Sequence, residues 1–213
     1  LSKTYASAKD ELKALDHLTL EVDKGEIFGY LGPNGAGKTT TIRLLLDLIR
    51  PTSGSARIFG LDARKDSLEI HKRIGFLPGE LNLWKNRTAA QVIYYVASVR
   101  GNVEPQLKES QKLADQLKFD ASKKVRDFST GNKRKLGLIL ALMHQPELLI
   151  LDEPTNGLDP LIQQTFNQMM RDIRAEGRTV FLSSHQLTEV QAICDRVAIL
   201  RDGQLRAVQS VEH

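Results

Sequence analysis

Cysteine is almost absent from this sequence, since Cys194 is the only one among 213 residues. An internal disulfide and a cysteine-based metal cluster are therefore excluded for this chain, which favours a reducing compartment such as the cytosol. Long hydrophobic runs are absent as well. The apolar run LGLILALM is far shorter than the roughly 20 residues that cross a bilayer, and no signal peptide is recognisable after Leu1. These absences predict a protein that is soluble by itself.

Charge of one sign does not dominate either. The net charge is +4 and the pI about 9.2, which fits a polyanionic ligand, but the basic residues are spread along the chain rather than gathered in a tail. With 41% hydrophobic residues the chain can form a sizeable core, and its length allows one or two domains of about 150 residues each. Composition alone therefore predicts a globular protein and names no ligand.

Short apolar segments alternate with helical patterns along the chain. Residues 18–22 (LTLEV) alternate as a half-buried strand should, and a Lys24-Gly25 turn follows. Further strands are expected at 26–32, 55–60, 72–77, 147–154 and 179–184. Helices are expected at 40–49, from Thr88, at 104–117, through Met143, at 160–176 and near Leu187. Short, wholly apolar strands between helices predict an α/β fold whose parallel sheet is covered on both faces.

Two local signals refine this pattern. Thr88 is a typical helix N-cap, and after it Val92, Val96 and Val99 fall on one helical face. Near the end of the chain an Asp-Gly pair separates two apolar alternations in RVAILRDGQLRAV. Such a pair favours a tight β-hairpin turn.

The clearest motif is GPNGAGKTT, which matches the phosphate-loop pattern between an expected strand and an expected helix. Gly32, Gly35 and Gly37 allow backbone amides to turn inward around an anion, and the helix N-terminus adds unpaired N–H groups. Lys38 is expected to reach the β and γ phosphates, and the Thr39 hydroxyl to hold Mg²⁺. The expected nucleotide-binding residues of this loop are Gly32, Pro33, Asn34, Gly35, Ala36, Gly37, Lys38, Thr39 and Thr40.

A carboxylate pair follows the apolar strand in LLILDEP. Asp152 at the strand end needs a cation or strong donors because a bare buried carboxylate is costly, and Mg²⁺ held through water would supply that partner. Side chains alternate along a strand, so Glu153 is expected to point elsewhere and to act as the base that polarises a water for attack on the γ-phosphate.

Phosphate loops serve several reactions. A GTPase is disfavoured because NKRK at Asn132 lacks the aspartate of the guanine-reading N-K-x-D motif, and no other match occurs. A small-molecule kinase would have no need for a water-activating Glu153.

The stretch DFSTGNKRKLGL is unusual for a helix start. Lys133, Arg134 and Lys135 crowd the first turn, although a helix N-terminus normally favours acidic residues. Something anionic is therefore expected to compensate, and otherwise the three cations would be largely solvated.

With these motifs in this order, nearly the whole chain resembles the nucleotide-binding subunit of an ATP-binding cassette (ABC) transporter. The resemblance implies a phosphate-loop ATPase core with a mostly parallel sheet, an N-terminal antiparallel β element and a helical subdomain. It places one domain over residues 1–213, with the ATP-binding core at 1–76 and 127–213 and the helical subdomain at 77–126. It also implies ATP and Mg²⁺ as ligands.

The resemblance assigns further residues. Tyr5 holds the place of the aromatic residue that stacks on adenine, and His185 in SSHQL that of the residue that hydrogen-bonds the γ-phosphate. Asp159 in GLDP matches a loop between two subunits. STGNK matches the family signature, in which Ser129 and Gly131 contact the ATP held by the other subunit. The three cations would then have an anion nearby.

Two departures from the family pattern stand out. Thr130 and Asn132 replace the glycine and glutamine of the usual signature, while the serine and the second glycine are kept. More seriously, Gly79 occupies the place of a glutamine that normally contacts Mg²⁺ and the membrane partner. Glu80 beside it could approach Mg²⁺ but cannot donate a hydrogen bond as glutamine does. Leu81, Leu83 and Trp84 follow, either packed within the domain or forming part of a groove for a transmembrane helix.

These features predict an ATPase that drives a separate transmembrane permease through ATP-dependent pairing with a second, identical cassette. STGNK and NGLDP look most like the exporter type, and the resemblance implies a place on the cytoplasmic face of the cell membrane. The competing class is a soluble cassette protein acting on nucleic acid or ribosomes. Such proteins usually carry a coiled-coil insertion or two cassettes, neither of which is present, so no nucleic-acid partner is expected. An ATP-binding module without turnover is disfavoured by Glu153 and His185.

Overall fold

A computed structural model describes residues 1–6 and 11–211. Its main sheet has six strands in the order β10-β9-β3-β8-β7-β6. All neighbours run parallel except the β9–β10 pair, which is antiparallel. The strands are β3 (Ile27–Leu31), β6 (Ile74–Leu77), β7 (Leu148–Asp152), β8 (Thr179–Ser184), β9 (Arg196–Arg201) and β10 (Gln204–Ser210).

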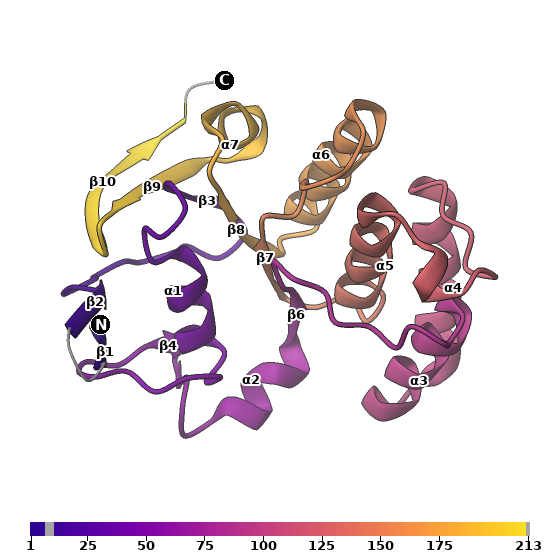
Figure 1. Ribbon diagram of the computed structural model, residues 1–213, viewed down its shortest axis with the longest axis horizontal. Helices are drawn as coiled ribbons and strands as arrows, with labels where there is room; N and C mark the ends of the chain where they lie inside the picture. The colour runs from indigo at the N-terminus through magenta and orange to yellow at the C-terminus, as the bar shows by residue number, and fades with distance from the viewer. Residues whose placement is uncertain (7–10, 212–213) are drawn as a thin grey trace.

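Helices cover both faces of this sheet, as the apolar strands predicted (Figure 1). They are α1 (Lys38–Leu45), α2 (Ser67–Arg73), α3 (Ala89–Arg100), α4 (Val103–Gln116), α5 (Thr130–Leu142), α6 (Pro160–Ala175) and α7 (Leu187–Ile193), with a 3-10 turn at Val125–Asp127. The strand period of two decides which residue meets which layer. Leu149 and Leu151 belong to the core shared with α3–α7, whereas Ile150 between them belongs to the core shared with α1 and α2.

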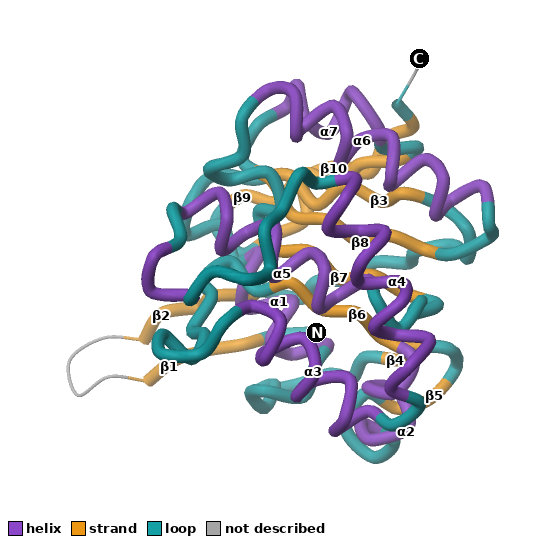
Figure 2. The backbone as a smooth tube through the Cα atoms, turned by 90° about the vertical axis from the view of Figure 1, so that its right-hand side faces the viewer, coloured by secondary structure: helices purple, strands orange, loops and turns teal. Residues whose placement is uncertain are grey.

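Two smaller sheets accompany the main one. An N-terminal antiparallel pair joins β1 (Lys3–Ala6) to β2 (Glu11–Leu15), and a second pair joins β4 (Arg57–Ile58) to β5 (Leu61–Asp62). Figure 2 shows the β1–β2 pair projecting to one side and α3 and α4 lying together. The predicted antiparallel element at the N-terminus is thus confirmed. None of the helices within residues 1–6 and 11–211 is long and apolar enough to cross a membrane.

Several local predictions are confirmed. The Thr88 hydroxyl caps α3 by accepting from the Gln91 N–H, and the Gln91 side chain returns a bond to the Thr88 N–H. In the β9–β10 hairpin Asp202 and Gly203 both have positive φ, at 52° and 73°. That is the backbone of a primed turn, which the Asp-Gly pair predicted.

Other predictions are wrong in detail. Residues 18–22 do alternate, with Leu18 buried, Leu20 and Val22 half-buried and the two residues between them exposed, but they form no ladder in the described chain. Leu18 instead bonds through its backbone to Leu1 at the chain start. The strand expected over 55–60 shortens to the two residues of β4. Val99 is 70% exposed beyond the packed part of α3, although Val92 is buried. The seven-residue helix α2 was not predicted.

Candidate functional site

The predicted catalytic residues converge where three parallel strands end. Leu31 of β3 pairs with Ser184 of β8, and Ser183 of β8 pairs with Asp152 of β7. Since these carboxyl ends lie at one edge, the loops that follow them meet there. They enclose a cleft of about 540 Å³. Its lining consists of Tyr5, Leu12, Lys13, Ala14, Asn34, Gly35, Gly37, Lys38, Thr39, Thr40, Gly79, Asp152, Glu153, Asn156, His185 and Asp202.

The phosphate loop has the backbone that its glycines predicted. Gly35 and Gly37 have φ of 82° and 106°, a region that other residues adopt at a cost. A Cβ on Gly37 would also lie 2.5 Å from the Ala14 carbonyl oxygen, so both the backbone conformation and the lack of space require a glycine here. Gly37 leads directly into α1, whose first turn has unpaired N–H groups and no acidic side chain. An anion is the expected partner of this helix end.

Lys38 is a buried cation at the floor of the loop. Its side chain is 6% exposed, and its ammonium donates to the carbonyl oxygens of Gly32 at 2.6 Å and Pro33 at 3.2 Å. It also pairs with the Glu153 carboxylate at 3.3 Å. The loop carbonyls thus hold the lysine in place while its charge faces the cleft.

Thr39 and Asp152 lie side by side, as a metal site requires. The Thr39 hydroxyl donates to Asp152 Oδ2 at 2.9 Å, and the fully buried Ser183 hydroxyl donates to Asp152 Oδ1 at 2.5 Å. Neighbouring oxygens of an octahedral Mg²⁺ site, with bonds of about 2.0–2.1 Å, stand about 2.9 Å apart. These two hard oxygens therefore fit the predicted metal.

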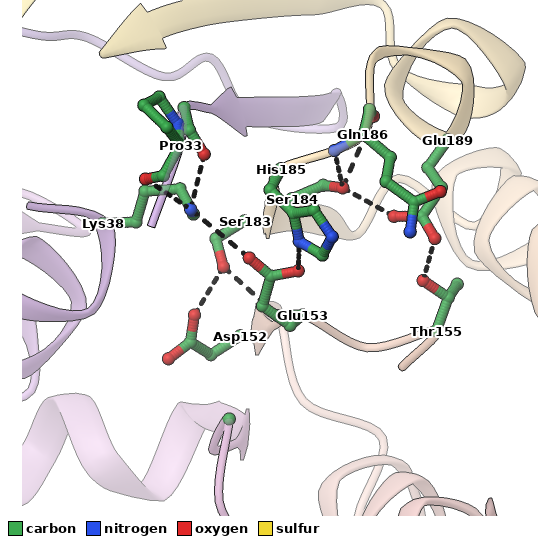
Figure 3. A network of polar contacts seen from close by, with 12 residues as sticks. Pro33, Lys38, Asp152, Glu153, Thr155, Ser183, Ser184, His185, Gln186 and Glu189 are labelled. Atoms are coloured by element: carbon green, nitrogen blue, oxygen red, sulfur yellow. Dashed lines mark hydrogen bonds and ion pairs between the residues drawn. The ribbon is translucent and has the colours of Figure 1, made fainter. Parts of the chain in front are cut away.

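Glu153 points away from Asp152, but not through strand alternation. Asp152 is the last residue of β7, and Glu153 has a left-handed backbone with φ of 51°. This turn sends the carboxylate between Lys38 and His185, whose Nδ1 lies 2.6 Å from Glu153 Oε2 (Figure 3). The predicted base and the predicted γ-phosphate contact are therefore direct neighbours.

Tyr5 lies at the outer rim of the cleft. It is 39% exposed in β1, and the Lys3 ammonium stands 4.9 Å from its ring centroid. Its position leaves a ring available to a base whose phosphates enter the loop.

The signature residues and Asp159 lie outside this cleft, beside one another. Ser129 caps α5 by accepting from the Asn132 N–H at 3.2 Å, and Asp159 caps α6 through two backbone N–H groups. A Cβ on Gly131 would stand 2.5 Å from the Gly157 carbonyl oxygen, so the helix start and the GLDP loop touch. Their roles at a nucleotide stay predictions.

The expectation that the three cations of this helix start have a partner's ATP nearby stays a prediction, but Arg134 is turned into its own chain. Its guanidinium is 5% exposed and donates to the carbonyls of Pro78 and Gly79, both at 2.8 Å. Lys135 is 9% exposed and Lys133 half-buried, so the alternative of three largely solvated cations is wrong. Periodicity could not show this because the acceptors lie more than 50 positions away.

The close packing around position 79 gives a structural reason for a glycine there. A Cβ there would lie 3.1 Å from Asp152 Oδ2, so the loop backbone itself approaches the carboxylate that is predicted to hold the metal. Glu80 is exposed and does not line the cleft. Leu81 and Leu83 pack against the core, whereas Trp84 is 52% exposed and meets Tyr95 edge-on.

Sequence reasoning missed a second polar network beside His185. The Glu189 carboxylate accepts from the Ser184 hydroxyl at 2.6 Å and the Thr155 hydroxyl at 2.5 Å. Glu189 of α7 thereby ties the loop after β7 to the end of β8 (Figure 3). The available signal was the pair Ser183-Ser184, two polar residues that end β8 after three apolar ones.

A larger groove of about 1000 Å³ lies between α2, α3 and α4. None of the predicted site residues lines it. The smaller cleft is the candidate site because the glycine loop, the lysine and the carboxylates meet there.

The sequence of this chain is similar to those of known proteins of one family. The family model described as ABC transporter matches residues 15–156. The bacitracin transport ATP-binding protein BcrA of Bacillus licheniformis is 42% identical over 206 residues, 96% of this chain and 66% of that protein. The probable multidrug ABC transporter ATP-binding protein YbhF of Escherichia coli is 36% identical over 200 residues, 92% of this chain and 34% of that protein.

A solved structure has the same fold. The ATP-binding cassette MJ0796, solved as a dimer bound to ADP and Pi, superposes with a TM-score of 0.89 over 100% of this chain and 97% of its own, at 23% identity. The chain spans just under two thirds of the length of the BcrA relative. Since the family model covers more than half of the chain, and the sequence motifs had predicted the same family, the chain belongs to the ABC transporter family.

Proposed function

We propose that this chain binds ATP with Mg²⁺ in the cleft and hydrolyses it, and that two copies share their sites while driving a separate membrane permease. The observation that carries the proposal is the contact of Glu153 with both Lys38 and His185 at the mouth of a phosphate loop. One base and two phosphate-seeking groups meet there. Thr39 and Asp152 would hold the metal, which supplies charge neutralisation of the phosphates when bound.

The ion pairs suggest how phosphate prepares the base. A γ-phosphate competes with the Glu153 carboxylate for Lys38 and His185, because both groups can donate to phosphate oxygens. Glu153 is then free to accept a proton from a water as that water attacks the γ-phosphorus. The bond from the γ-phosphorus to the bridging oxygen breaks, and ADP and inorganic phosphate form.

The separation of the two anion-seeking helix starts supports the second copy. Ser129 and Gly131 do not line the cleft of their own chain, although Ser129 opens α5 in an exposed position. Each site would combine the phosphate loop of one chain with the signature of the other. A homodimer satisfies this with one sequence.

Aromatic side chains support the permease partner. Trp84, Tyr94 and Tyr95 are 52%, 58% and 53% exposed on the segment that follows Gly79 and on α3. Exposed aromatic side chains of this kind are suited to a protein partner. The bacitracin and multidrug relatives support export as the direction, and a place at the cytoplasmic face of the membrane goes with that role.

Two variants separate binding from chemistry. Lys38→Ala should weaken binding of MgATP, since the buried ammonium that faces the phosphates is lost. Glu153→Gln keeps the shape but removes the base, so hydrolysis should fall by about 10²–10⁴ while ATP still binds. Nucleotide affinity and turnover are measured for both variants. Hydrolysis at the parental rate in Glu153→Gln would refute the assignment of the base.

A further inference from the structure

Arg134 joins two parts of the molecule that the sequence analysis left unexplained. One is the cationic start of α5, and the other is the loop in which Gly79 replaces glutamine. The Arg134 guanidinium donates through Nη1 to Pro78 O and through Nη2 to Gly79 O, each at 2.8 Å. Nη1 also lies 3.5 Å from the backbone oxygen of Asp152. A rigid fork with two well-placed acceptors fixes a loop more firmly than a single amine could.

The loop held in this way lies against the metal carboxylate. A Cβ on Gly79 would be 3.1 Å from Asp152 Oδ2, the oxygen that accepts the Thr39 hydroxyl. No side chain separates the two, so the position of the Gly79 backbone limits where the carboxylate can stand. Burial lowers the pKa of Arg134, and the charges of Asp152 and Glu153 oppose this shift. The guanidinium is thus also a buried counter-charge for both carboxylates.

The same residue is fixed to the signature. Arg134 lies five positions after Ser129 on α5, about 7.5 Å along the helix axis. A helix moves as a unit over so short a distance. Any shift of the helix start would therefore carry the guanidinium, and with it the two carbonyls.

We propose that Arg134 is a positioning residue that holds the Pro78–Gly79 backbone against Asp152 and so sets the metal-dependent part of nucleotide binding. Gly79 has no side chain with which to fix this loop, and Arg134 fixes it from α5 instead. The inference rests on the proposed function, because it concerns the metal site of the same cleft.

Binding measurements with and without Mg²⁺ test this directly. The affinity of ADP is measured by calorimetry in excess Mg²⁺ and in excess EDTA, and the ratio gives the gain due to the metal. Arg134→Gln should reduce that gain about tenfold while the affinity in EDTA stays within about twofold, since the phosphate loop is untouched. Arg134→Lys keeps the charge and one donor, and should recover part of the gain.

Two further variants keep the outcome interpretable. Gly79→Ala disturbs the same contact from the other side and should reduce the gain as well. Arg100→Gln removes a guanidinium that also donates to a backbone carbonyl, that of Ile74 at 3.4 Å, and neither residue lines the cleft. It should leave the gain unchanged.

The inference is overturned if folded Arg134→Gln keeps the parental gain, or if it weakens binding equally with Mg²⁺ and with EDTA. If Arg134→Gln does not fold, the decision falls to Arg134→Lys and Gly79→Ala, and a parental gain in both overturns it. A parental chain that binds no nucleotide in either buffer would instead refute the proposed function.

Discussion

Removing the Ser183 hydroxyl should destabilise the fold, because this hydroxyl donates to the buried Asp152 carboxylate. Ser183 is fully buried in β8, and its hydroxyl donates to Asp152 Oδ1 at 2.5 Å while accepting from the Glu153 N–H at 3.2 Å. The Glu153 N–H also donates to the backbone oxygen of residue 183 at 3.2 Å, and this bond remains in Ser183→Ala. Only the bond to Asp152 is therefore lost without a replacement. Asp152 is 3% exposed, so in the close side-chain packing around it water replaces the lost bond poorly.

A hydrogen bond to a charged group contributes about 1.5–3 kcal/mol, and we expect the free energy of unfolding to fall by that amount. Urea denaturation of the nucleotide-free chain measures it, with an unchanged m-value as the sign that both states are comparable. Ser98→Ala is the control, because that hydroxyl donates to the Tyr94 carbonyl on an exposed helix face and should matter by less than about 0.5 kcal/mol. A loss for Ser183→Ala no greater than the control would refute the reasoning.

Two other predictions concern recognition of the nucleotide's purine ring and the pH dependence of stability. If the Tyr5 ring reads the base by stacking, ATP and GTP should compete within about tenfold, or about 1.4 kcal/mol, and Tyr5→Ala should weaken both alike; a selective loss of ATP in competition assays would contradict this. Burial, with Arg100 and Arg178 nearby, lowers the pKa of His144 from 6.5 to about 4, while its Nε2 bonds to the Ile74 carbonyl. Because the folded-state pKa of His144 lies below its unfolded value, protonation favours the unfolded chain. The free energy of unfolding is therefore fully retained above pH ~6.5 and falls by roughly 1–2 kcal/mol as the pH drops towards 4, after allowance for partial exposure. The free energy of unfolding of the parent should fall relative to that of His144→Asn in that window, and a difference that stays constant with pH would show that His144 is not responsible.

Most of the fold could be predicted because its signals are local. β7 and β8 are apolar runs between helices, and the phosphate loop, the Thr88 cap and the Asp202-Gly203 turn each follow from a few adjacent residues. Residues 18–22 show the limit of this reasoning. Their alternating burial was right, but a strand also needs a ladder partner, and tertiary packing decides that.

The arrangement of the site was less accessible from the sequence. The motifs identified Lys38, Glu153 and His185 separately, but the contact among them depends on the left-handed turn at Glu153 and on the strand order of the sheet. Arg134 shows the same limit more sharply. Its helix position suggested an anion, whereas its acceptors are two carbonyls from a distant loop.

The shared site between two copies is the central claim, and trapping of nucleotide in mixed dimers tests it most directly. On a Glu153→Gln background, one preparation carries Lys38→Ala and the other Ser129→Arg. Each preparation alone should occlude no ATP in a dimer, since every site contains one damaged half.

In a mixed dimer one site carries both defects, and the other pairs an intact phosphate loop with an intact signature. The account predicts one occluded ATP per mixed dimer, measured with labelled nucleotide after separation by size. No occlusion in mixed dimers that demonstrably form, or normal closure around ATP in the Ser129→Arg preparation alone, would contradict it.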